Sequence, residues 1–246
     1  MRKQSPVYRF LSYEGMEATI KTEQLRFSNP RTFNDPLDGS YHLFPSRYMM
    51  NSSITTREPF ESYSVFLSEN VYKSVYVCCF SKEYKSKDAY LMWAHYGEKH
   101  KNLCFELTWA NEENNFKFLG GPEEVKYGNL VDIRNDAERF DKIDLGNYLT
   151  HTKSDIWKYE KEQRFLVDLE HKNATESLIP KVEKDYCYVN FDLKMITKVI
   201  FGLNSPEDQV KKIISCFLNK SYTPIFVKLF IDTETLELEE KKLSVN

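Results

Sequence analysis

Two glutamates separated by a single residue stand directly before an apolar segment. Glu160 and Glu162 lie in the segment from residue 157 to residue 167, and Arg164 follows two residues later. Because residues i and i+2 of an extended chain point to the same side, we expect the three charged side chains to share one face at a strand entrance. Two neighbouring carboxyl groups can divide their roles, with one ionised and the other tuned as an acid or base. The alternative interpretation is a solvated strand edge, on which Glu160 and Arg164 are ordinary surface charges.

Two further polar residues occur in separate strand-like segments. Arg9 lies inside the segment 7–11, and Ser81 follows the continuous apolar segment 75–80. An arginine fork suits a diphosphate, and a serine hydroxyl can orient a ribose or the glutamate. A carboxylate such as that of Glu162 stabilises the oxocarbenium-like charge that develops when a glycosidic bond breaks. Together these residues would serve cleavage of the nicotinamide–ribose bond of NAD, with NAD as the substrate.

A polar loop follows the second strand-like segment, 25–28. It contains Asn34, Asp35 and Asp38 together with two prolines and a glycine, which are residues that fix or permit turn geometry. One interpretation is a rigid turn in which Asp38 caps the next segment of the chain. The other is a ligand-binding lid, because polar loops after strands often carry binding residues.

An aromatic helix is expected over residues 88–101. Trp93, Tyr96 and His100 lie at i, i+3 and i+7, on one face of that helix. Packing is the favoured role for this face, and a ring offered to a planar ligand is the alternative. His95 and His100 are five residues apart, which is not the i, i+4 spacing of a helical zinc pair.

The order of expected elements indicates one α+β domain over residues 1–246. The opening 7–28 reads as strand, helix and strand, and further strands are expected at 75–80, 103–107, 124–130, 162–167, 186–191 and 198–202. Helices are expected at 58–69, within 136–157 and at 207–218, where Pro206 stands at the start. One or two strands within 224–238 would close the fold. No internal repeat or linker is evident.

Composition describes an ordinary soluble globular protein of the cytoplasm. Charged residues make up 29% of the 246-residue chain and hydrophobic ones 41%, with a net charge of -3. This charge gives no general reason to expect nucleic-acid or membrane binding. The five cysteines have no paired short spacing, so we expect reduced thiols rather than disulfides. No signal peptide or apolar segment of bilayer length is expected.

Several motif classes are not matched, and three classes of function stay open. The sequence has no phosphate-binding glycine loop, nucleophile elbow or structural-zinc spacing. The first class is the NAD chemistry described above. The second class is a metal-dependent phosphodiesterase or nuclease, which would use clustered carboxylates. The third class is a non-catalytic module that grips a nucleotide or peptide with its aromatic face. In the second class, the phosphodiesterase or nuclease, the metal site would be built from Asp35, Asp38, Glu160 and Glu162.

Four sequence blocks, in order, resemble a widespread and mainly bacterial family of unknown function, DUF2971. The blocks are Phe33-Asn34-Asp35-Pro36-Leu37-Asp38, Cys79-Phe80-Ser81, Leu91-Met92-Trp93-Ala94-His95-Tyr96 and Trp157-Lys158-Tyr159-Glu160-Lys161-Glu162-Gln163-Arg164. The resemblance spans residues 8–167, within a family-like core of residues 8–240. Beside Arg9 and Ser81, the residues expected to bind NAD all lie in these blocks, and they are Asn34, Asp35, Asp38, Trp93, His95, Tyr96 and Arg164. One departure is Asn102, where a glycine is usual before the next strand.

The order of Arg9, Ser81 and the Glu160-x-Glu162 pair is similar to the Arg–Ser–Glu signature of ADP-ribosyltransferases. This resemblance implies a split β-sheet core with flanking helices, in which Arg9 holds NAD phosphate and Ser81 orients the site. Glu162 would contact the ribose 2′-hydroxyl, and Glu160 would activate an acceptor. The acceptor would be a protein, a nucleic acid or water. A toxin or phage-defence role with a neutralising partner protein would suit such an enzyme. The Ser-Thr-Ser motif of that class is absent, because Cys79-Phe80-Ser81 stands in its place.

Overall fold

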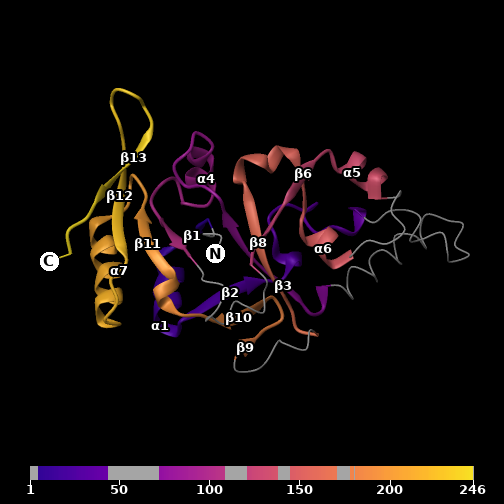
Figure 1. Ribbon diagram of the computed structural model, residues 1–246, viewed down its shortest axis with the longest axis horizontal. Helices are drawn as coiled ribbons and strands as arrows, with labels where there is room; N and C mark the ends of the chain where they lie inside the picture. Colours follow the sequence, from indigo (N-terminus) through magenta and orange to yellow (C-terminus); the bar gives the residue numbers. More distant parts are fainter. Residues whose placement is uncertain are drawn as a thin grey trace, which may run out of the picture.

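The computed structural model describes residues 5–43, 72–108, 121–137, 145–170, 178–179 and 181–245. These residues combine helices with one large sheet, so the expectation of a mixed α and β fold is confirmed (Figure 1). The helix expected at 58–69 lies outside the described residues. None of the described helices is long and apolar enough to cross a membrane.

The sheet has eleven strands, in the order β13-β12-β11-β4-β1-β3-β2-β10-β9, with β8 on β3 and β5 on β8. β6 and β7 form a separate pair. The strands are β1 (Val7–Leu11), β2 (Gln24–Ser28), β3 (Val75–Ser81), β4 (Leu103–Leu107), β5 (Glu123–Glu124), β6 (Lys126–Gly128), β7 (Thr152–Ser154), β8 (Glu162–Asp168), β9 (Lys181–Val182), β10 (Tyr186–Asn190), β11 (Ile196–Phe201), β12 (Ile225–Ile231) and β13 (Leu238–Lys242). The α-helices are α1 (Tyr13–Thr22), α4 (Ala89–His95), α5 (Leu130–Ala137), α6 (Leu145–Thr150) and α7 (Glu207–Asn219). The short 3₁₀ segments are η1 (Pro30–Thr32), η2 (Tyr41–Leu43), η4 (Asp155–Glu160) and η5 (Leu193–Met195).

The sheet divides at β3, and this division positions the site. One edge of β3 pairs with β8 along its whole length. The other edge is shared, because Ser81 pairs with Tyr8 of β1 and Val77 pairs with Ser28 of β2. β3 is a continuous apolar strand that is buried on both faces, as expected for a central strand. The strands β1 and β2 therefore diverge from each other over the middle of β3.

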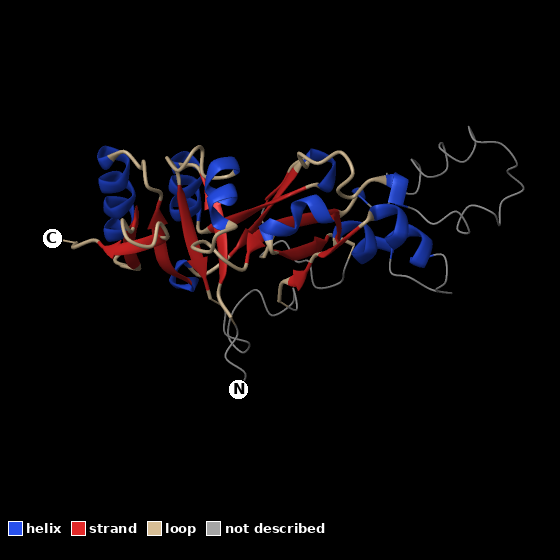
Figure 2. Cartoon of the chain, turned by 90° about the horizontal axis from the view of Figure 1, so that it is seen from above, coloured by secondary structure: helices blue, strands red, loops and turns tan. Residues whose placement is uncertain are grey.

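Different helices cover the two faces of the sheet. α1 and α7 pack against each other and against the larger apolar core, through residues such as Met16 and Phe217. Trp93 of α4 packs in a smaller core on the other face, with Tyr8 and Cys104. Figures 1 and 2 show an elongated molecule, with α7, β12 and β13 at one end and α5 and α6 at the other. The residues around β3 lie between these ends.

Local sequence signals account for the best-predicted elements. Ser12 caps α1, because its Oγ accepts a hydrogen bond from the Gly15 amide at 3.1 Å. The expected strands 7–11 and 103–107 match β1 and β4, and β12 lies within the range 224–238 expected for the closing strands. The last strand, β13, begins only at the end of that range and extends to Lys242. The continuous strand expected at 124–130 is wrong, because β5 and β6 belong to different sheets. The helix expected at 88–101 ends at His95, and the turn after it contains Glu98, Lys99 and His100 at positive φ.

Candidate functional site

A cavity of about 360 Å³ opens where β1 and β2 diverge over β3. Its volume is typical of small-molecule sites. Arg9, Ser81, Glu160 and Glu162 all line it, although they come from three strands and from the 3₁₀ segment η4. The other predicted site residues that line it are Asn34, Asp38, Tyr96 and Arg164, whereas Asp35, Trp93 and His95 do not.

Arg164 is the centre of a buried ionic cluster, and only 1% of its side chain is exposed. Its Nη1 and Nη2 atoms donate to the two carboxylate oxygens of Asp38, at 2.8 and 2.5 Å. Its Nε and Nη2 atoms donate to the two oxygens of Glu162, at 2.8 and 2.9 Å. Nη1 also donates to the Thr150 carbonyl oxygen. All five N–H donors of the guanidinium are therefore used, which fixes both carboxylates.

Lys153 completes the cluster, and it is not among the site residues predicted from the sequence. Its Nζ atom lies 2.5 Å from Glu160 Oε2, 3.2 Å from Glu162 Oε2 and 3.5 Å from Asp38 Oδ2. Burial alone would lower the pKa of Lys153, but Glu162, Asp38 and Glu160 outweigh it and hold the pKa above its usual value. The helix expected through this region is wrong at this point, because Lys153 lies in the short strand β7.

The ammonium of Lys153 stands where a metal ion would have to bind. Asp38, Glu160 and Glu162 converge on it, and within the described ranges no group of three His, Cys, Asp or Glu side chains is arranged to hold a metal. Asp35 is separate from this group, because its Oδ1 atom accepts a hydrogen bond from the Leu37 amide at 2.9 Å. The donor set therefore does not suit the metal-dependent alternative.

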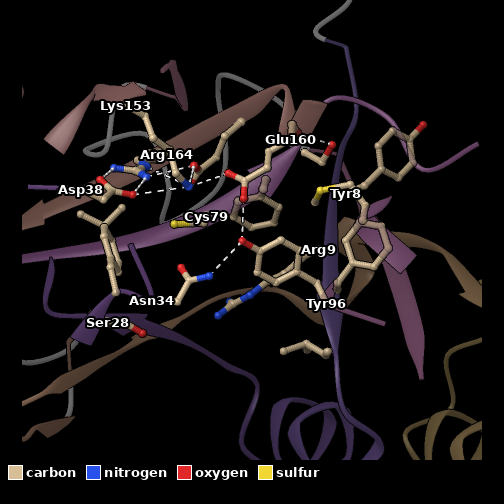
Figure 3. A pocket seen from close by; sticks show the side chains of 18 of the residues that line it. Tyr8, Arg9, Ser28, Asn34, Asp38, Cys79, Tyr96, Lys153, Glu160 and Arg164 are labelled. Atoms are coloured by element: carbon tan, nitrogen blue, oxygen red, sulfur yellow. Dashed lines mark hydrogen bonds and ion pairs between the residues drawn. The ribbon is translucent and has the colours of Figure 1, made fainter. Parts of the chain in front are cut away.

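Glu160 faces the cavity through a different set of contacts. Its Oε1 atom accepts a hydrogen bond from the Tyr96 hydroxyl at 2.6 Å, and Asn34 Nδ2 donates to the same hydroxyl at 3.4 Å (Figure 3). Burial and the neighbouring charge of Glu162 raise the pKa of Glu160, against the opposing effect of Lys153. Burial also raises the pKa of Glu162, but Arg164 and Lys153 outweigh it and lower that pKa. The two carboxyl groups thus have opposite shifts.

The backbone brings the two glutamates together in an unexpected way. Glu160 ends the 3₁₀ segment η4, Lys161 has left-handed geometry with φ 45°, and β8 begins at Glu162. The extended chain expected from Glu160 to Glu162 is therefore wrong, although both side chains converge. The solvated strand edge is also wrong, because Glu160 and Glu162 have side-chain exposures of 3% and 7%.

Ser81 supports this turn rather than contacting either carboxylate. Its Oγ atom lies 2.8 Å from the Glu160 carbonyl oxygen and 2.9 Å from the Glu83 carbonyl oxygen. The Cα register places Tyr8, Ser81 and Glu162 side by side across β1, β3 and β8. Ser81 is therefore placed to position the backbone of Glu160.

Side chains alternate between the two faces of a strand, so Arg9 lies on the opposite face of β1 from Tyr8 and reaches the cavity from there. Its Nη2 atom donates to the Arg26 carbonyl oxygen at 2.7 Å, and its guanidinium lies 5.8 Å from the centre of the Phe80 ring. This contact bridges the diverging strands β1 and β2. Among the described residues no carboxylate forms an ion pair with Arg9.

The remaining predicted residues have structural contacts. Trp93 is fully buried, and its Nε1 atom donates to the Tyr84 carbonyl oxygen at 2.8 Å. Its ring stacks on His100, in agreement with the packing role. His95 is exposed, and its Nδ1 atom lies 2.9 Å from the Tyr159 hydroxyl. In the polar loop Asp35 shapes the turn, and Asp38 pairs with Arg164 and Lys153 in place of the expected cap. The ligand-binding lid stays a prediction.

Comparison with known proteins gives one match. No curated protein and no solved structure matches the chain significantly. The model of a family described as "Protein of unknown function (DUF2971)" matches residues 92–165. The matched residues include Tyr96, Lys153, Glu160, Glu162 and Arg164, so they contain most of the buried cluster and its tyrosine. The resemblance to DUF2971 is therefore confirmed over residues 92–165.

Proposed function

We propose that the chain binds NAD in this cavity, breaks the nicotinamide–ribose bond and transfers ADP-ribose to an acceptor. The observation that carries the proposal is that Arg9, Ser81 and Glu162, which are far apart in the sequence, line one cavity together with Glu160. The weaker resemblance to the Arg–Ser–Glu signature supports the same assignment. Because similar folds and signatures host different activities, the proposal rests on the local chemistry of these side chains.

The first step is the departure of nicotinamide. The C1′–N bond breaks, its electron pair goes to the pyridine nitrogen, and positive charge develops on the ribose ring. The buried cluster has three carboxylates and two cations, so it keeps one negative charge when all of them are ionised. A fixed negative charge in a water-poor site stabilises the developing cation. The lowered pKa of Glu162 keeps its own carboxylate ionised in this cluster.

The second step is attack by the acceptor at C1′. A hydroxyl group or a water molecule forms the new C1′–O bond, and its proton passes to the carboxylate of Glu160. Glu160 suits this role because burial and Glu162 raise its pKa, which makes it a better base than an exposed glutamate. Tyr96 orients Glu160 through the hydrogen bond to Oε1. With water as the acceptor the reaction is NAD hydrolysis.

The test measures nicotinamide release from NAD by the purified chain. Glu162→Gln keeps the size of the side chain and removes its charge, so we expect release to fall about 100- to 1,000-fold, the range seen when one electrostatic stabiliser is lost. Glu160→Gln should slow transfer to an acceptor hydroxyl. The matched control is Glu234→Gln, a substitution in the exposed turn between β12 and β13. Equal release by the wild type and by Glu162→Gln would contradict the assignment of Glu162.

A second function is favoured by one observation. Both oxygens of Glu162 already accept hydrogen bonds from Arg164. A carboxylate held in this way can form a rigid part of the cavity lining as well as take part in a reaction. A module that recognises nucleotides without turnover therefore fits the same cavity. In that case ADP-ribose and NAD would raise the melting temperature equally, and no nicotinamide would appear. Nicotinamide release that depends on Glu162 would exclude this function.

A further inference from the structure

The end of the cavity formed by β1 and β2 differs in charge from the end formed by the buried cluster. Arg9 and Arg26 both line the cavity, and neither forms an ion pair with any carboxylate of the described residues. Figure 3 shows Arg9 and Ser28 on the side of the cavity away from Lys153 and Arg164. This end therefore carries two positive charges without a counter-ion from the described chain.

Arg26 is held in place without using its hydrogen-bond donors. Its guanidinium lies 4.7 Å from the centre of the Tyr186 ring, in a cation–π contact. Within the ranges that the structure describes, its side chain donates no hydrogen bond, so five N–H groups are available to a ligand. Arg9 uses one donor on the Arg26 carbonyl oxygen, which ties the two residues together. Two positive charges at one end of a cavity, with no counter-ion among the described residues, favour a bound anion.

We infer that Arg9, Arg26 and the hydroxyl of Ser28 form a subsite for a diphosphate group. An arginine pair suits a diphosphate because each planar fork can donate two parallel bonds to phosphoryl oxygens. Ser28 lies at the end of β2 and also lines the cavity. Neither Arg26 nor Ser28 is among the site residues predicted from the sequence. β1 and β2 diverge over β3, and each of them contributes one arginine to the lining of the cavity.

This inference rests on the proposed function, and it fixes the direction in which NAD would lie. The nicotinamide ring is positive and the diphosphate is negative, one ribose apart. The cavity has the complementary arrangement, with a net negative cluster at Glu160 and Glu162 and positive charge at Arg9 and Arg26. The nicotinamide ribose therefore lies between Glu162 and Arg9, with its diphosphate against Arg26.

The test compares ligands with and without a diphosphate by isothermal titration calorimetry. The ligands are ADP-ribose, inorganic pyrophosphate and nicotinamide riboside, and the variants are Arg26→Gln and Arg26→Lys. We expect Arg26→Gln to weaken ADP-ribose and pyrophosphate about 10- to 100-fold, because charge-assisted hydrogen bonds are lost. Nicotinamide riboside should bind all variants equally, and Arg26→Lys should be intermediate because it keeps the charge and loses the fork.

The control is Arg134→Gln, which removes the same charge from α5, outside the cavity lining. It should bind every ligand like the wild type. Unchanged affinity of Arg26→Gln for ADP-ribose and pyrophosphate would overturn the subsite, and so would a wild type that binds neither. Pyrophosphate binding that depends on Arg26, without nicotinamide release from NAD, would keep the subsite and overturn the proposed function. Nicotinamide release together with ligand affinities that do not depend on Arg26 would keep the proposed function and overturn the subsite.

Discussion

The two ends of the cavity use arginine in opposite ways. Arg164 is buried, and all of its donors bind carboxylates or a carbonyl oxygen of the same chain. Arg26 is exposed, and among the described residues its guanidinium is fixed by the face of the Tyr186 ring alone. A guanidinium with every donor satisfied builds a rigid wall, whereas one with free donors can bind a ligand. Residue type alone therefore does not identify an arginine that binds a ligand, whereas the use of its hydrogen-bond donors does.

The largest expected difference between the two ends concerns stability. Arg164→Met would leave Asp38 and Glu162 buried with Lys153 as the one cation that still pairs with them among the described residues, so we expect the free energy of unfolding to fall by about 3–5 kcal/mol. Arg26→Met removes no hydrogen bond to any residue that the structure describes, and it should change the free energy of unfolding by less than about 0.5 kcal/mol. Urea denaturation of both variants measures the contrast. Equal losses would show that the two arginines do not differ in this way.

The pH dependence of stability should separate the two glutamates. The lowered pKa of Glu162 means that its contribution is present above the unfolded pKa of about 4.3 and is lost as pH falls through the folded value. The raised pKa of Glu160 has the opposite sign, because its contribution is present below the unfolded pKa and is lost as pH rises through the folded value.

Denaturation of the wild type and of each Gln variant between pH 3 and pH 7 tests these signs. The excess stability of the wild type over Glu162→Gln should grow as pH rises from 3 to the unfolded pKa of about 4.3, by at most about 1.4 kcal/mol per pH unit, and then stay constant. Its excess over Glu160→Gln should shrink with pH. Slopes of the same sign for both variants would contradict the division of roles between the two carboxyl groups.

The smallest expected effect comes from Tyr96→Phe, which removes the hydrogen bond to Glu160. That bond lowers the pKa of Glu160, so its loss should raise the pKa and move the acidic limb of the nicotinamide-release profile to higher pH. The expected loss of stability is about 1 kcal/mol. Tyr84→Phe is a matched control, because Tyr84 donates to Glu240 at 2.6 Å outside the cavity lining. An identical pH profile for wild type and Tyr96→Phe would remove the orienting role of Tyr96.

The sequence predicts the central strands well, because their signals are local. The apolar segment at 75–80 becomes β3, and the helix at 207–218 becomes α7 almost unchanged. The departure at Asn102, where the family usually has a glycine, also has a local explanation. A Cβ atom on the facing Gly202 would overlap with the carbonyl oxygen of His100, so the glycine that this close approach needs lies on the other segment.

The site is predicted less completely, because its geometry depends on contacts between distant segments. Lys153 lies in a three-residue strand with no periodic signal, and the three buried acids around it, together with the Trp157 ring, hold its ammonium in place. Lys161 has a positive φ that its residue type does not indicate. Arg26 looks like any exposed strand residue until the division of the sheet places it at the cavity. Lys153 could have been found from the sequence by asking which cation balances the negative charges of Asp38, Glu160 and Glu162.

The strand order also determines when the protein can fold during its synthesis. β2 pairs with β10, whose residues follow it by about 160 positions, and β4 must be joined on one side by β11. Asp38 binds Arg164, which is synthesised 126 residues later. β1 can pair early with β3 and β4, whereas β2 has to wait for β10 and β4 for β11. We expect the sheet to assemble after translation has passed residue 200, with the slow closure typical of long-range strand pairing.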